Sequence, residues 1–67
     1  MTTRWTLEMR LPIPEGKGYQ SWAPVAVTPD GSMETFNQEQ ALEALAHWKE
    51  ELPETQFRLW VWEARLV

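Results

Sequence analysis

Apolar and polar residues alternate most regularly near the start of the chain. Trp5, Leu7, Met9 and Leu11 fall on one side of an extended chain, and the residues between them are polar or charged. A period of two with one apolar side is typical of a β-strand that lies with one face on a core. Pro12 follows, and we expect the strand to end there because proline cannot donate a hydrogen bond to a sheet ladder.

A second strand is predicted for residues 22–28, and Pro24 within it indicates an edge or bulged strand. The next residues, Thr28-Pro29-Asp30-Gly31, are typical of a turn, since proline presets its own φ and glycine accepts a positive one. The segment 32–36 then has two interpretations. It either returns as a short strand or leads directly into a helix.

The clearest helical pattern follows Asn37, which can cap a helix, with Gln40 in the position of a capping-box partner. Apolar residues then recur at the helical period until Pro53 ends the pattern. The predicted core side of this helix consists of Ala41, Leu42, Leu45, Trp48 and Leu52.

The last run, residues 56–67, is apolar on both of its alternating sides. A strand with one face on a core needs only one apolar side, and one helix covers only one face of a sheet. Phe57, Leu59 and Val61 match the inward residues of the first strand, so we predict that they face the helix. The residues predicted for the opposite side are Arg58, Trp60, Trp62, Ala64 and Leu66.

These patterns predict one α+β domain over residues 1–67, with the element order β-β-α-β. We expect a single antiparallel three-stranded sheet in the spatial order 2-1-3, in which the last strand lies beside the first. One helix packs on one face. On the open face, Arg58, Trp60 and Trp62 should then lie beside Arg10, Glu8 and Arg4. The candidate binding residues are Trp60, Trp62, Arg58, Arg10, Arg4 and Trp22.

Three interpretations of this open face remain. The loop of residues 12–22, which carries Tyr19 and Trp22, could fold over the outer tryptophans and bury them. Alternatively, the face is a protein interface, because tryptophan and arginine are the residues most enriched at interface hot spots. The third interpretation is single-stranded nucleic-acid binding, with bases stacked on the sheet. A net charge of −4 argues against a general binder of phosphate backbones.

The amino-acid composition limits which metal-binding and catalytic sites the chain can form. The chain has no cysteine and one histidine, His47, so it can build neither a disulfide nor a site with several histidines. His47 and Glu43 could bind a metal or move a proton, but a solvated helix face explains both. Gly16-Lys17-Gly18 lacks the spacing of a phosphate loop. We therefore expect no enzyme activity, no catalytic or metal-binding residue and no cofactor.

The distribution of apolar residues along the chain indicates where the protein is located. No apolar run approaches the roughly 18 residues that a membrane-spanning helix needs. The first residues lack the apolar core of a signal peptide. We expect a cytoplasmic protein that does not enter a membrane.

Four short motifs occur along the chain: Trp5-x-Leu7-Glu8-x-Arg10, Trp22-Ala23-Pro24, Thr35-Phe36-Asn37-x-Glu39-x-Ala41 and Phe57-Arg58-Leu59. In this order they resemble those of small orphan proteins from tailed bacteriophages of actinobacteria. The resemblance spans most of the chain and implies an accessory protein of the host cytoplasm that binds a host protein and has no catalytic residues.

Together these observations predict a small non-enzymatic protein-interaction module. Its partner is a host protein or a second copy of the chain, in a homodimer, bound through the open sheet face or the last strand. Single-stranded nucleic-acid binding by the same face is the alternative.

Overall fold

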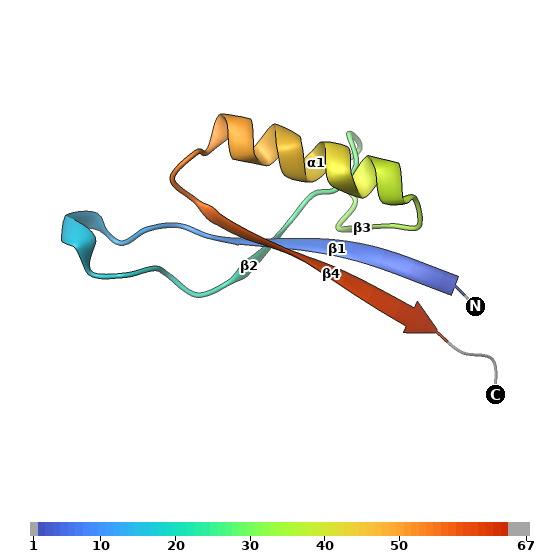
Figure 1. Ribbon diagram of the computed structural model, residues 1–67, viewed down its shortest axis with the longest axis horizontal. Coiled ribbons are helices and arrows are strands. Elements are labelled where there is room, and N and C mark those ends of the chain that lie inside the picture. Colours follow the sequence, from blue (N-terminus) through green and yellow to red (C-terminus); the bar gives the residue numbers. More distant parts are fainter. Residues whose placement is uncertain (1, 65–67) are drawn as a thin grey trace.

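The computed structural model describes residues 2–64 of the chain (Figure 1). The predicted extension of the last strand to Val67, with Leu66 on its outer side, lies outside these residues. The elements in chain order are β1 (Thr2–Arg10), the 3₁₀ turn η1 (Pro14–Gly16), β2 (Ala23–Val25), β3 (Glu34–Thr35), α1 (Gln38–Glu51) and β4 (Gln56–Ala64).

The centre of the sheet is β1, which pairs antiparallel with every other strand. Its pairing with β4 covers all nine residues of each strand, and Leu7 lies opposite Leu59 in this register. The helix α1 lies along one face of the sheet and leaves the opposite face open (Figure 1). The predicted α+β fold, with the last strand antiparallel to the first, is confirmed.

The edge of β1 away from β4 is occupied by two short strands placed end to end. Leu7 pairs with Val25 of β2, and the preceding residue, Thr6, pairs with Glu34 of β3. The last of the three predicted strands therefore corresponds to β4. The short strand that was one of two interpretations of residues 32–36 is present as β3. The sheet has four strands in three positions, rather than the three strands expected.

The segment between β2 and β3, here called the 26–33 loop, leaves the sheet and returns to it. Its base is closed by the Val27 amide, which donates to the Ser32 carbonyl oxygen at 2.8 Å. The predicted turn is present: Gly31 has φ 90° and its amide donates to the Thr28 carbonyl oxygen at 3.1 Å. The Asp30 carboxylate accepts from the Thr28 hydroxyl and the Ser32 amide, which hold the pKa of Asp30 below its usual value.

The loop between β1 and β2 continues their hairpin rather than leaving it. The Gln20 amide donates to the Leu11 carbonyl oxygen, and the Ile13 amide donates to the Gly18 carbonyl oxygen, each at 2.8 Å. The tip of this 11–22 loop projects along the long axis of the molecule, at the end opposite to the last residues of β4 (Figure 1).

The helix begins as predicted, with one change in its cap. The side chain of Asn37 accepts a hydrogen bond from the Gln40 amide at 3.2 Å. The reciprocal bond of a capping box is replaced by Thr35, whose hydroxyl donates to the Gln40 side chain at 2.6 Å and accepts from the Asn37 amide at 3.2 Å. Thr35 is buried, so β3 and the helix start form one hydrogen-bonded unit.

The core lies between α1 and the sheet. Its buried members are Leu7, Val25 and Val27. Trp48 packs against them and donates its indole N–H to the Ala26 carbonyl oxygen at 2.9 Å, which ties the helix to the 26–33 loop. The partly buried residues around this cluster are Met9, Ala44, Leu45, Trp48, Phe57 and Leu59.

One predicted core residue of the helix is wrong. Leu42 is 48% exposed, and Ala44 takes its place against the core. At 100° per residue, Leu42 lies a quarter turn or more from the centre of the core stripe. Glu43, Ala44 and His47 line the side of α1 next to the 26–33 loop. Leu42 therefore lies on the other flank, the one toward β4.

Within residues 2–64, no helix has both the length and the hydropathy needed to cross a membrane.

We expect that Asn37→Ala lowers the free energy of unfolding by about 1 kcal/mol, because the Gln40 amide loses its acceptor at the helix start. Urea denaturation measures this change. Asn37→Ser, which retains a capping oxygen, should restore most of the lost stability. Equal stability of the alanine variant and the wild type would show that the cap contributes nothing.

Candidate binding surface

The β1–β4 register decides which side chains share the outer face, the sheet face away from α1. Arg4 lies opposite Trp62, Thr6 opposite Trp60, and Glu8 opposite Arg58. Residues directly opposite each other in an antiparallel pair point to the same face of the sheet. The division of β4 into two faces, predicted from the sequence, is therefore confirmed over residues 57–62. Val61, however, is 47% exposed and does not join Phe57 and Leu59 against the core.

The outer face carries a continuous row of aromatic rings and guanidinium groups, which we call the tryptophan–arginine ladder. Its members come from β1, β4 and the 11–22 loop, and each contacts the next. In order along the sheet they are Tyr19, Arg10, Trp22, Arg58, Trp60, Trp62 and Arg4.

Arg58 is the central arginine of the ladder. Its guanidinium carbon lies 4.2 Å from the ring centroid of Trp22 and 4.8 Å from that of Trp60. Arg10 bridges the loop aromatics in the same way, at 4.7 Å from Trp22 and 4.9 Å from Tyr19. Cation–π contacts at partly exposed sites contribute about 0.5–1 kcal/mol each, so several in series hold the row in one arrangement.

At the other end of the ladder two indoles stack. The rings of Trp60 and Trp62 are 5.9 Å apart at an interplanar angle of 30°, and the Arg4 guanidinium carbon lies 5.5 Å from the Trp62 ring. Offset stacking of this kind is a favoured geometry for aromatic pairs.

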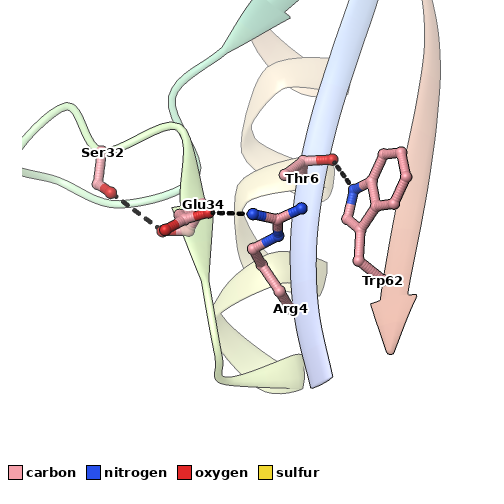
Figure 2. A network of polar contacts seen from close by, with 5 residues as sticks. All are labelled: Arg4, Thr6, Ser32, Glu34 and Trp62. Atoms are coloured by element: carbon pink, nitrogen blue, oxygen red, sulfur yellow. Dashed lines mark hydrogen bonds and ion pairs between the residues drawn. The ribbon is translucent and has the colours of Figure 1, made fainter. Parts of the chain in front are cut away.

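Hydrogen bonds fix the orientation of both indoles. The Trp62 indole N–H donates to the Thr6 hydroxyl oxygen at 2.8 Å (Figure 2), and the Trp60 indole N–H donates to the Glu8 carboxylate. In each case the acceptor is the diagonal neighbour on β1, so the two rings lean in the same direction. Both indole N–H groups therefore already have an acceptor within the chain.

Two carboxylates balance two of the three arginines. Arg58 donates through Nε to Glu8 at 2.7 Å, and Arg4 donates through Nη1 to Glu34 of β3 at 3.2 Å (Figure 2). The Arg58 guanidinium, followed by the Trp60 indole N–H, holds the pKa of Glu8 below its usual value. Arg10 donates through Nε to the Gln56 side chain at 2.7 Å and has no carboxylate partner among the described residues.

The 11–22 loop extends the ladder and does not cover it. Trp60 remains 40% exposed and Trp62 46% exposed. Trp22 and Tyr19 lie in line with the strand residues, at the Arg10 end, while the loop tip projects beyond the sheet (Figure 1). The interpretation in which this loop buries the outer tryptophans is therefore wrong for the single chain.

All six candidate residues named from the sequence lie in this ladder. Two kinds of residue in or beside the ladder are not among the predicted binding residues. Tyr19 is the first, and its place in the row depends on the bridge between Pro12 and Tyr19. Alternation in the first strand places Thr6 on the outer face but does not mark it as a hydrogen-bond partner of Trp62, and no periodic pattern marks Glu34. An arginine with a carboxylate at the paired position, as for Arg58 and Glu8, is the one such signal readable in advance.

A hollow separate from the ladder lies between α1 and the 26–33 loop. Its volume is about 520 Å³, and its lining includes Glu43, His47 and Trp48. His47 is exposed and packs edge-on against Trp48, with ring centroids 5.5 Å apart. No three metal-ligating side chains gather anywhere in residues 2–64. The ladder is thus the more highly organised candidate site.

Comparison with models of known protein families, with curated proteins and with solved structures finds no match for this chain.

We expect Glu8→Gln to flatten the dependence of stability on acid pH. A lowered pKa in the folded state means that ionised Glu8 stabilises the fold above its ordinary pKa of about 4.3. This contribution is lost as the pH falls through the lowered value. The free energy of unfolding should favour the wild type at pH 7, and the difference should shrink on acidification. Parallel pH profiles for the two proteins would contradict this.

Arg58→Lys should lower the free energy of unfolding by about 1 kcal/mol, although it retains the charge. Lysine can keep the ion pair to Glu8, but it lacks the planar group that contacts two tryptophan rings. Chemical denaturation measures the loss, and near-ultraviolet circular dichroism reports the tryptophan environment. Arg4→Lys removes a single ring contact and should have a smaller effect. If both substitutions leave stability and spectrum unchanged, the ladder does not hold the tryptophans in place.

Proposed function

We propose that this chain is a non-enzymatic protein-interaction module and that the tryptophan–arginine ladder is the face that docks on a partner protein. The observation that carries the proposal is the exposure of Trp60 and Trp62, 40% and 46%, in rings already held by stacking and hydrogen bonds. Tryptophan and arginine dominate interface hot spots. Side chains that are ordered before binding lose little conformational freedom on binding.

The charges of the ladder favour a partner surface that is largely apolar. Glu8 and Glu34 already pair with Arg58 and Arg4, so the face has little net field with which to attract a highly charged partner. An open sheet face with ordered aromatic rings instead offers contact area. Apolar patches of this kind on soluble proteins commonly mark interaction sites.

Nucleic-acid binding is the alternative use of the same face, and two observations oppose it. Each of Trp22, Trp60 and Trp62 already has two ring contacts within the ladder, so a stacked base would compete with them. The Glu8 carboxylate lies next to Trp60, where it would repel a phosphate. The chain as a whole has a net charge of −4.

The resemblance to short phage proteins suggests which organism supplies the partner. If the chain is such a phage accessory protein, it acts in the host cytoplasm, and the protein that docks on the ladder belongs to the bacterial host.

Trp62→Ala should abolish or strongly weaken capture of the partner while leaving the fold intact. Proteins retained from a bacterial lysate by immobilised wild type, and lost with Trp62→Ala, would be purified and titrated by calorimetry. Loss of a hot-spot tryptophan costs about 2 kcal/mol or more, so we expect the dissociation constant to rise about 30-fold. Met33→Ala changes another exposed apolar residue, away from the ladder, and should bind as the wild type does.

A tryptophan-fluorescence titration with single-stranded oligonucleotides at two salt concentrations distinguishes nucleic-acid binding from protein binding. Protein capture that depends on Trp62, without quenching at low salt, supports the proposal. Salt-dependent quenching, with no protein that distinguishes Trp62→Ala from wild type, would replace it with nucleic-acid binding.

A further inference from the structure

The two edges of the sheet are built differently. The edge made by β2 and β3 has strands of three and two residues, carries Pro24 and is interrupted by the 26–33 loop. Short strands, proline and interruptions are the usual means by which proteins prevent an edge from pairing with another chain. This edge is therefore protected against strand addition.

The other edge, formed by β4, lacks such protection. Its nine residues contain no proline, glycine or lysine. Within residues 2–64, β1 is the one strand that pairs with β4, so the backbone groups on the far side of β4 have no strand partner. A long unpaired edge with two charged residues among its nine, Arg58 and Glu63, is a template for pairing with another strand.

Exposed apolar side chains lie on both faces at this edge. Trp60 and Trp62 are on the outer face, whereas Val61, on the helix side, is 47% exposed. Leu42, on the flank of α1 toward β4, is 48% exposed. A partner lying on one face of the sheet would leave the other face bare. A partner strand beside β4, with its own helix, contacts both.

We propose that β4 pairs antiparallel with β4 of a second copy of this chain, about a two-fold axis that passes between the two Trp60 residues. The axis is perpendicular to the sheet, so the two helices lie on one face of a continuous sheet and the two ladders lie on the other. The interface is isologous, as in most homodimers.

The sequence of β4 complements itself in this register. Centring the pair on Trp60 is the arrangement that uses all nine residues of the strand. Arg58 then lies opposite Trp62 of the second copy, a favourable cross-strand pair on the outer face. On the helix side, Leu59 lies opposite Val61 of the second copy. Centring on Arg58 would instead place two arginines opposite each other.

The small core favours a second copy of this chain as the partner at the β4 edge. Only four apolar residues are buried in the described chain, Leu7, Val25, Val27 and Ala41. A domain of this size without cysteine or a metal cluster commonly gains the missing buried area by oligomerisation. Because α1 lies over both β1 and β4, the two helices would approach to about 10 Å, the spacing of packed helices. Leu42 faces this gap.

This inference goes beyond the proposed function, since it concerns the edge of β4 and does not require the ladder to bind anything. A substitution at Val61 distinguishes the dimer from partner binding by the ladder. Val61 lies on β4 at the proposed dimer edge, but on the helix side and outside the ladder.

Sedimentation equilibrium over a range of concentrations tests the dimer. The wild type should approach twice the 7.9 kDa mass of one chain. Val61→Lys buries a charge opposite Leu59 of the second copy and should raise the dimer dissociation constant about tenfold or more. Met33→Lys introduces the same charge at a residue that is 52% exposed in the 26–33 loop, at the edge of the sheet away from β4, and should remain dimeric. Circular dichroism checks that both variants fold.

Hydrogen exchange locates the interface. Protection of alternate β4 amides that rises with protein concentration, while β2 amides are unaffected, supports edge pairing. A wild type that stays monomeric at millimolar concentration overturns the inference, and so does a dimer without this protection. The two proposals can fail separately. If Trp62→Ala retains every protein that the wild type captures, while Val61→Lys is monomeric, the proposed function fails and the dimer stands.

Discussion

A single helix can cover only one face of a sheet, and this constraint shapes the whole molecule. The pairing of β1 with β4 through all nine residues fixes which side chains meet α1 and which do not. Leu7 and Leu59 turn toward the helix and close the core, while Trp60 and Trp62 turn away from it. The outer aromatic residues must therefore be stabilised by something other than the main core. The arginines and carboxylates of the ladder supply that support.

The features predicted correctly from the sequence are those that follow from local periodicity. Alternation in β1 and the two apolar sides of β4 were sufficient to assign the outer positions of Arg58, Trp60 and Trp62. The features that were missed depend on how elements are placed side by side. Leu42 satisfies the helical period, but its exposure depends on the lateral position of α1 over the sheet. The place of Tyr19 in the ladder depends on a bridge across the 11–22 loop, which no local pattern encodes.

The strand β4 takes part in both proposed interactions, through different atoms. Its outer side chains build the ladder, and its unpaired backbone edge is the proposed dimer contact. In such a dimer the two ladders share one continuous sheet face, so a partner protein would meet twice the aromatic surface of one chain. The acidic residues of α1 lie on the opposite side of the sheet, which separates the charge of the helix from the arginines of the ladder.

The ladder is ordered yet open to solvent in the protein before it meets a partner. Hydroxyl-radical footprinting with mass spectrometry, performed on the protein alone and with its partner, tests this most directly. In the protein alone, Trp60 and Trp62 should be oxidised faster than Trp48, which packs against the core, and the partner should slow the oxidation of both. Oxidation of Trp60 and Trp62 as slow as that of Trp48 in the protein alone would show that the chain covers them itself, and would contradict the account.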